Sequence, residues 1–293
     1  MSATPRSMRS LFRPPRWASL TASPALLVGG TILVLVILSA LLAPLIAGPD
    51  PFLIRPRLRF RPPDSTFWFG TDALGRDVFA LVVHGGRLSL LVGLLCALAG
   101  AVLGTLVGLV SGYVRALDAV VMRVMDGMMA IPSLLFAVAL VSLVGPSLFS
   151  IVAAITFSEI PRVTRLVRSV VLGVREESYV RAAEGLGIPG PLVLLRHILP
   201  SCIAPLIVQT TYMFAAAMLS EAVLGFLGVG FPPDMPSWGN VLAEGRAVFQ
   251  RAPWTILAPG FFLAATVMAV NLLGDGLRDR LDPRLSRSTG AAS

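Results

Sequence analysis

The sequence predicts an all-α integral membrane protein with about six transmembrane helices. Hydrophobic residues make up 55% of its 293 residues, charged residues only 14%, and the mean hydropathy is +0.81. A soluble domain usually carries about 25% charged residues, so this chain lacks the polar surface of a water-soluble globule. Several apolar runs also approach the roughly 20 residues that one helix needs to cross a bilayer.

The basic residues exclude several classes of function. All 24 are arginines, the formal net charge is +8, and they form short clusters between apolar runs. That pattern suits lipid headgroups and topology control better than nucleic acid. A P-loop needs a lysine on the nucleotide phosphates, so this chain has no such site. The two cysteines and two histidines lie far apart, and we therefore predict no catalytic residue, metal site or cofactor for the chain itself.

The first predicted span covers residues 25–47, which carry no charge. It follows a tail, residues 1–24, with four arginines and no acid. The span is too long for the apolar core of a cleaved signal peptide, so we interpret it as a retained anchor with a cytoplasmic N-terminus. A Pro-rich and Arg-rich extracytoplasmic loop is expected over 48–87.

A core of five further helices is predicted over residues 88–275, followed by a cytoplasmic tail at 276–293. Gly100, Gly104 and Gly108 share one face of its first helix, which permits close approach of a neighbouring helix. The third of the five is the weakest, because it counts as a span only if its helix continues past Glu159 and Pro161 towards Val170. The expected spans are 88–112, 127–144, 148–170, 202–227 and 256–273.

The arginines favour cytoplasmic termini. With six spans and the N-terminus inside, 16 arginines fall in cytoplasmic segments and eight outside, as the positive-inside rule requires. Arg55, Arg57, Arg59 and Arg61 are the exception, because they cluster in the first outer loop.

The loop over residues 171–200 is the most informative cytoplasmic segment, since a loop of this length often has a function. It predicts a short amphipathic helix around Tyr179 that Gly187 ends as a C-cap. Pro200, after Leu199, suits the first turn of the next span. Within the helix, Ala182 and Ala183 would form a small face that fits a groove of another protein, flanked by Arg181 and Glu184.

This segment resembles the cytoplasmic coupling loop of ABC-importer permeases, whose motif is EAA, three residues, G, nine residues, I, one residue and LP. Arg181 stands where that family usually has Glu, and His197 stands where it has Ile. The matching residues are Ala182, Ala183, Gly187, Leu199 and Pro200.

Three more segments resemble the same family, in the family's order from about residue 66 to 285. Residues 69–79 are similar to the GTDxxGRDV segment of dipeptide, oligopeptide and nickel importer permeases, and residues 236–240 and 271–284 match two further segments. The first span resembles the extra helix of the C-type subunit. The residues of the GTDxxGRDV match are Gly70, Thr71, Asp72, Gly75, Arg76 and Asp77; a structural role and contact with a binding protein are both open for them.

The resemblance implies a type I ABC-importer permease in a bacterial or archaeal inner membrane. Its implied partners are a homologous B-type permease subunit in a heterodimer, two cytoplasmic ATPase subunits that bind ATP and Mg, and an extracytoplasmic solute-binding protein. The loop over 171–200 would transmit force from the ATPases. Peptide is the expected solute, with nickel or another small solute as the alternative.

Candidates for the translocation pathway come from polar residues in the spans, because intramembrane charge is costly. Glu221 either lines the pathway or pairs with an arginine such as Arg246. Asp126 has a transport role or bonds to Arg123 or a neighbouring loop, whereas Glu159 is expected to pair with Arg162 or Arg165. The remaining candidates form a stripe that either lines the pathway or packs against a helix, namely Gln209, Met213 and Ser220.

Two functions from other classes compete with the permease. A self-contained secondary carrier would show an inverted repeat between its halves, which this sequence lacks. An intramembrane hydrolase would need a histidine within a span or paired membrane aspartates, and neither is evident.

Overall fold

The computed structural model describes residues 24–48 and 50–281, so most of both predicted tails and the end of the C-terminal motif lie outside it. Within these residues every regular element is a helix, apart from one β-bridge between Thr71 and Asp77, which confirms the all-α class. The elements are α1 (Pro24–Leu41), α2 (Ala43–Ile46), η3 (Pro56–Leu58), α3 (Val78–Tyr113), α4 (Arg115–Ala130), α5 (Ser133–Val144), α6 (Leu148–Arg175), α7 (Ser178–Gly185), α8 (Gly190–Val193), η4 (Leu194–Ile198), α9 (Leu199–Phe226), α10 (Trp238–Arg246) and α11 (Trp254–Leu281).

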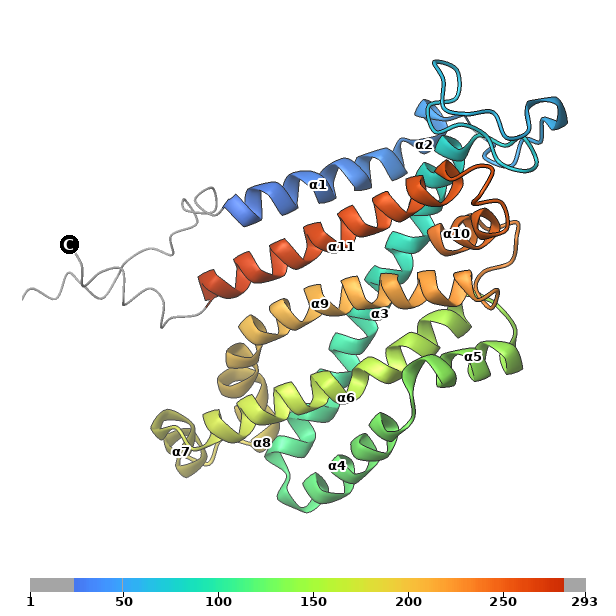
Figure 1. Ribbon diagram of the computed structural model, residues 1–293. Coiled ribbons are helices and arrows are strands. Elements are labelled where there is room, and N and C mark those ends of the chain that lie inside the picture. The colour runs from blue at the N-terminus through green and yellow to red at the C-terminus, as the bar shows by residue number, and fades with distance from the viewer. Residues whose placement is uncertain (1–23, 49, 282–293) are drawn as a thin grey trace, which may run out of the picture.

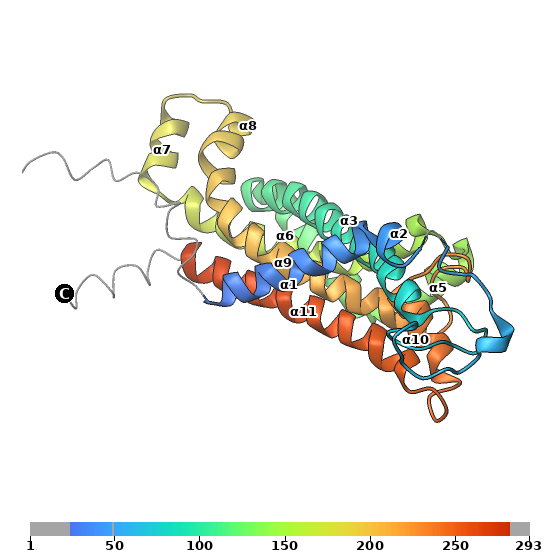
Figure 2. The same ribbon diagram turned by 90° about the horizontal axis from the view of Figure 1, so that it is seen from above.

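The helices form a bundle with two distinct ends. Helices α1, α11, α9 and α6 run alongside one another, and the long α3 crosses them (Figure 1). Both views place α7 and α8 at one end, and α2, η3 and α10 at the other (Figures 1 and 2). The described chain begins and finishes at the α7 end, at Pro24 and Leu281. This arrangement fits the predicted placement of both termini on the side of the coupling loop.

The number of spans depends on α6. Four helices, α1, α3, α9 with the segment before it, and α11, are long and apolar enough to cross a bilayer, and α4 with α5 forms a fifth, bent candidate. Helix α6 has 28 residues, which exceeds the length that a span requires, but it contains several charged residues. It runs unbroken through Pro161 to Arg175, so the expected continuation of the fourth segment towards Val170 is confirmed.

The segment predicted as a span over 127–144 is not one continuous helix. Helices α4 and α5 meet at an angle of 83° on either side of Ile131 and Pro132. Proline has no backbone N–H, and its ring disfavours helical geometry in the residue before it. Ile131 is accordingly extended, with φ −84° and ψ 124°.

Three other boundaries differ from the sequence predictions. Helix α3 begins at Val78, well before residue 88, because the Asp77 side chain caps it by accepting a hydrogen bond from the Phe79 N–H at 2.9 Å. The first span ends at Leu41, and a separate short helix, α2, covers the rest of its predicted length. Helix α10 was not predicted, because it lies in a polar connection with Gly, Pro and Asp on either side.

Glycines bring α3 into close contact with α6. A Cβ atom at Gly104 would lie 2.5 Å from Cβ of Val163, and one at Gly108 would lie 2.8 Å from Cβ of Val167. One at Gly100 would overlap the side chain of Met213 on α9. The predicted close approach at these three glycines is therefore confirmed, and α3 joins the two ends of the bundle as one packed unit.

Candidate functional site

Helix α7 has one buried face and one exposed face. Val180 and Ala183 are 0% and 5% exposed, and Val180 belongs to a core cluster with residues of α6, α8 and η4. Tyr179, Ala182 and Leu186 lie on the other side at i, i+3 and i+7. Because Tyr179 is 48% and Leu186 is 83% exposed, α7 presents an apolar strip with nothing from the described chain over it.

This geometry corrects the predicted small face. Successive helical residues point about 100° apart, so Ala182 faces outward while Ala183 is part of the core. The flanking charges also have partners of their own. Arg181 pairs with Glu176, and this hydrogen bond and the arginine charge lower the pKa of the Glu176 carboxyl.

Gly187 ends α7 in the predicted C-cap position. Its φ is +77°, the left-handed region that favours glycine. Its N–H donates to the Glu184 carbonyl at 2.9 Å, and the Ile188 N–H donates to the Ala183 carbonyl at 3.2 Å. These two bonds are those of a Schellman motif, so the glycine fixes the direction in which the chain leaves α7.

After a turn over residues 186–189, the return segment runs from α8 to α9 without a break. Helix α8 continues into the π-helix η4, which continues into α9 at Leu199. Pro200 lies in the first turn of α9, as predicted, where its missing N–H costs little. Ile198 is fully buried at the junction. Continuous helical backbone therefore joins α8 to α9; we call α7, α8 and the turn between them the coupling hairpin.

Tyr113, at the end of α3, attaches the coupling hairpin to the bundle. Its hydroxyl donates to Glu184 Oε1 at 2.9 Å, and a Cβ at Gly190 would lie 3.1 Å from its ring. Nearby, Arg175 at the end of α6 donates to the last two carbonyls of α3, with a distance of 3.3 Å to that of Tyr113. Sequence analysis did not identify Tyr113, since 71 residues separate it from Glu184.

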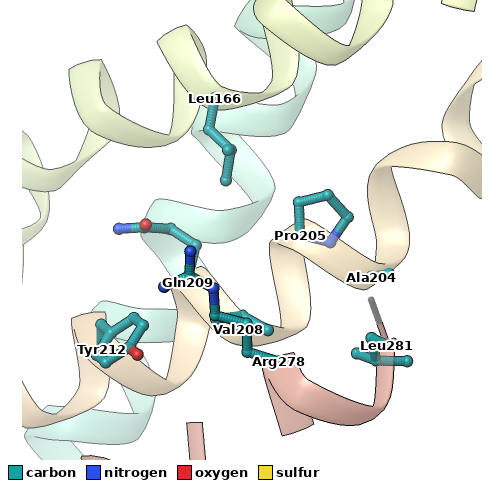
Figure 3. Close-up of a pocket in the computed structure, with 8 residues that line it drawn as sticks. All are labelled: Leu166, Ala204, Pro205, Val208, Gln209, Tyr212, Arg278 and Leu281. Atoms are coloured by element: carbon teal, nitrogen blue, oxygen red, sulfur yellow. The ribbon is translucent and has the colours of Figure 1, made fainter. Parts of the chain in front are cut away.

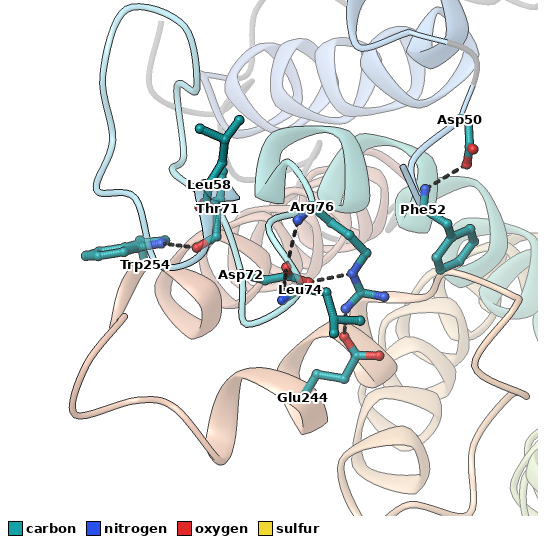
Figure 4. A network of polar contacts seen from close by, with 9 residues as sticks. All are labelled: Asp50, Phe52, Leu58, Thr71, Asp72, Leu74, Arg76, Glu244 and Trp254. Carbon is teal, nitrogen blue, oxygen red and sulfur yellow. Dashed lines mark hydrogen bonds and ion pairs between the residues drawn. The ribbon is translucent and has the colours of Figure 1, made fainter. Parts of the chain in front are cut away.

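The predicted GTDxxGRDV residues build a folded cap at the α10 end (Figure 4). The Asp72 carboxylate accepts hydrogen bonds from the Leu74 and Arg76 N–H groups at 2.8 Å each and from the Arg76 side chain at 2.5 Å. Arg76 also pairs with Glu244 of α10, and Trp254 Nε1 donates to the Thr71 carbonyl at 3.0 Å. We call residues 50–77 with α10 the outer cap.

Each remaining residue of that motif has a local role. Gly70 and Gly75 have φ of +70° and +76° and lie against the carbonyls of Arg61 and Arg55. Asp77 caps α3, and loss of water around it raises the pKa of its carboxyl. These contacts support the structural interpretation of the motif, while contact with a binding protein stays a prediction.

Comparison with known proteins identifies the family. Residues 100–287 match the family described as "Binding-protein-dependent transport system inner membrane component". The chain belongs to this family. It is 55% identical over 264 residues, 90% of each chain, to the "Probable peptide ABC transporter permease protein" of Sinorhizobium fredii. It is 40% identical to the "Di/tripeptide transport system permease protein" of Pseudomonas aeruginosa, over 93% of this chain and 92% of that one.

A solved structure shares the fold. The inward-facing MetNI methionine ABC transporter superposes with a TM-score of 0.56 and 18% identity, covering 69% of this chain and 96% of that one. The chain is thus a multi-pass membrane permease of an ABC importer with the corresponding helical fold, and the predicted family is confirmed.

The three residues of the predicted pathway stripe lie in environments that differ from one another. Gln209 lines a groove of about 470 Å³ between α6, α9 and α11, together with Tyr212 and Arg278 (Figure 3). Met213 is 1% exposed and packs against Gly100 of α3, so it serves helix packing in this conformation. Ser220 donates to the carbonyl of Ala216 within α9.

Each of the three acidic residues that were predicted within the membrane has a polar partner. Asp126 accepts from Arg165 of α6 at 2.5 Å, and Glu159 pairs with Arg162 at 2.8 Å as predicted. Glu221 is 1% exposed and accepts from Ser89 of α3 at 2.9 Å.

The expected pairing of Glu221 with Arg246 is wrong. The guanidinium of Arg246 lies 5.0 Å from the ring centre of Phe226 instead. No sequence signal pointed to Ser89, which is 132 residues away from Glu221.

Proposed function

We propose that this permease forms half of the pathway of an ATP-driven peptide importer. Its relatives support this, since it is 55% and 40% identical to chains named for peptide and di/tripeptide transport. The other half would be a homologous B-type subunit. An extracytoplasmic binding protein would deliver the peptide, and two cytoplasmic ATPase subunits would bind ATP and Mg. This chain itself would hold no cofactor and hydrolyse nothing.

The exposed strip of α7 is the observation that carries the coupling role. A short helix that leaves Tyr179 and Leu186 in solvent has the form of an amphipathic helix that docks in a partner's groove. The coupling hairpin contacts α3 and α6 and continues through η4 into α9, so an ATPase that moved it would move these helices together. Rigid-body motion of this kind gives alternating access.

Uptake by reconstituted transporter tests this function. Proteoliposomes that contain both permease subunits and both ATPases should accumulate labelled dipeptide only when the binding protein and ATP are supplied. Uptake by this chain alone, driven by an ion gradient, would instead identify a secondary carrier. Competition by nickel chelate but not by peptide would change the assigned solute.

Orientation has a separate test. We infer that the α7 end and both termini face the cytoplasm. A cysteine at the exposed Ala182 should react with a membrane-impermeant maleimide in inside-out vesicles and not in intact cells. The native Cys96 and Cys202 are buried and should stay unlabelled in both. Labelling of intact cells would reverse the topology.

A further inference from the structure

Four arginines of the outer cap have no role in the function proposed so far. Arg55, Arg57, Arg59 and Arg61 lie at the α10 end, opposite the coupling hairpin, and the positive-inside rule would not place such a cluster outside. A departure from this rule needs another physical reason.

The segment that carries them is held in one conformation. The Arg55 N–H donates to the Leu74 carbonyl at 3.2 Å, and the Phe60 N–H donates to the Asp72 carbonyl at 3.2 Å. Within it, Pro56–Leu58 forms the 3-10 helix η3. The arginines therefore stand on a segment fixed to the outer cap.

Two of the four already have partners, and two do not. Arg61 pairs with Asp64 at 2.7 Å, and Arg55 lies over the ring of Phe67 at 5.7 Å. Arg57 and Arg59 are exposed and form no ion pair with any residue in the described part of the chain. They alternate with the half-buried Leu58 and Phe60, so both point away from the cap.

Exposed apolar side chains occur on the same fixed segment and on the stretch of chain bonded to it. Leu53, Ile54 and Leu74 are 51%, 54% and 37% exposed, and Leu74 is joined to Arg55 through the backbone bond. Arginine beside exposed apolar residues is typical of protein interfaces. We call the five residues Leu53, Ile54, Arg57, Arg59 and Leu74 the arginine surface.

The side chains typical of a bilayer interface gather elsewhere on the outer cap. Trp68, Leu257 and Phe261 are 64%, 62% and 70% exposed and line one groove at the start of α11. Exposed aromatic residues of this kind belong at headgroup level. The arginine surface thus differs in composition from the lipid-facing side of the cap, and this favours a protein partner over lipid.

We propose that the arginine surface docks an acidic face of the extracytoplasmic binding protein. This inference rests on the proposed function, which requires such a partner at the outer cap. Two unpaired cations on a fixed segment would attract carboxylates during approach and fix their register, while Leu53 and Ile54 would be covered on docking.

Charge reversal tests the proposal on the whole transporter. The complex in zwitterionic nanodiscs would be titrated with the fluorescently labelled binding protein at 50 and 300 mM NaCl. The double variant Arg57→Glu, Arg59→Glu should weaken docking about tenfold or more at low salt and remove most of its salt dependence. The double variant with lysine at both positions should dock within about threefold of wild type, because the charge is kept.

A matched control makes the same charge change on α4, away from the outer cap. Arg115→Glu with Arg123→Glu alters two exposed arginines of α4 and should leave docking unchanged. Size-exclusion chromatography would verify that each complex assembles.

Each contrary outcome has one meaning. Wild-type docking that Arg57→Glu and Arg59→Glu leave intact would overturn the arginine surface and leave the permease function standing. Wild-type complex that neither docks the binding protein nor takes up peptide would overturn the proposed function itself. If the variant docked the binding protein normally and only its binding to vesicles containing 30% phosphatidylglycerol were weakened, the surface would be a lipid site and the proposal would be overturned.

Discussion

The two ends of this permease are built in opposite ways. At the α10 end, Trp238 is 1% exposed and its Nε1 donates to the Val82 carbonyl at 2.8 Å. A Cβ on Gly225 of α9 would lie 2.7 Å from the backbone of Gly239 of α10. At the α7 end, the coupling hairpin meets α3 chiefly through Tyr113, and Leu186 is 83% exposed.

This contrast separates an end that is packed tightly onto the bundle from an end that is attached to it by few contacts. The outer cap buries Trp238 of α10 against α3, packs Gly239 against α9 and pairs Arg76 with Asp72 and Glu244, so it is expected to move with α3 and α9 as one body. The coupling hairpin leaves an apolar strip that no described part of the chain covers. Stability should therefore respond most to changes at the α10 end, and coupling to changes at the α7 end.

The largest effect on stability should come from Trp238→Ala. A buried tryptophan replaced by alanine costs about 3–5 kcal/mol through lost packing and the cavity left behind, so the melting temperature of the purified complex should fall by several degrees. Trp68→Ala is the control, because Trp68 is 64% exposed and should change it little. Equal losses in both variants would contradict the tight packing of α10.

The second largest loss of stability should come from Arg76→Gln. It leaves Asp72, which is 7% exposed, without its cation, and removing one partner of a buried ion pair costs about 3 kcal/mol or more. Glu244→Gln removes an acid that is 45% exposed and should cost at most about 1 kcal/mol. Thermal melts and limited proteolysis of residues 50–77 would measure the loss of stability in both variants. A larger loss for Glu244→Gln would contradict the conclusion that the buried pair of Arg76 with Asp72 stabilises the outer cap most.

Much of the fold was predictable from local pattern. Apolar runs located most of the spans, the four-residue glycine spacing located the face of α3 on which other helices pack, and Gly187 located the end of α7. The bend at Pro132 was missed because the apolar run continues across it, although proline chemistry could have indicated it. Helix α10 was missed because Trp238 is buried only through contacts with α3 and α9, which local sequence does not reveal.

The candidate sites were predictable where a residue acts through its own backbone and not where it acts through distant partners. The cap at Gly187 was predicted because it depends on its neighbours in sequence, whereas the equally local cap at Asp77 was missed when α3 was expected to begin at residue 88. The partners of Glu221 and Glu184 come from α3, more than 70 residues away in each case. The predicted small face failed because adjacent residues of a helix point about 100° apart, so Ala182 faces solvent while Ala183 is buried.

At the α7 end, Gly187→Val should impair coupling more than stability. A Cβ there would meet nothing within 4 Å, so the penalty comes from the φ of +77°, about 1–3 kcal/mol for a side chain in that region. The turn should change direction and ATP hydrolysis should lose its link to uptake. Gly185→Ala also has open space but normal helical geometry, and should keep the ratio of uptake to hydrolysis. A wild-type ratio in Gly187→Val would refute the fixed turn.

The smallest effect is expected from Tyr113→Phe. This change removes the hydrogen bond to Glu184 and keeps the ring against Gly190, so the loss should be about 0.5–1.5 kcal/mol. Because this bond joins α7 to α3, amide hydrogen exchange should quicken in residues 178–186 and stay unchanged in α10. Tyr113→Ala, which also removes the ring, should quicken exchange further. If both variants exchanged at the wild-type rate, α6 and α9 alone would hold the coupling hairpin, and the contrast between the two ends would be greater than the contacts of Tyr113 indicate.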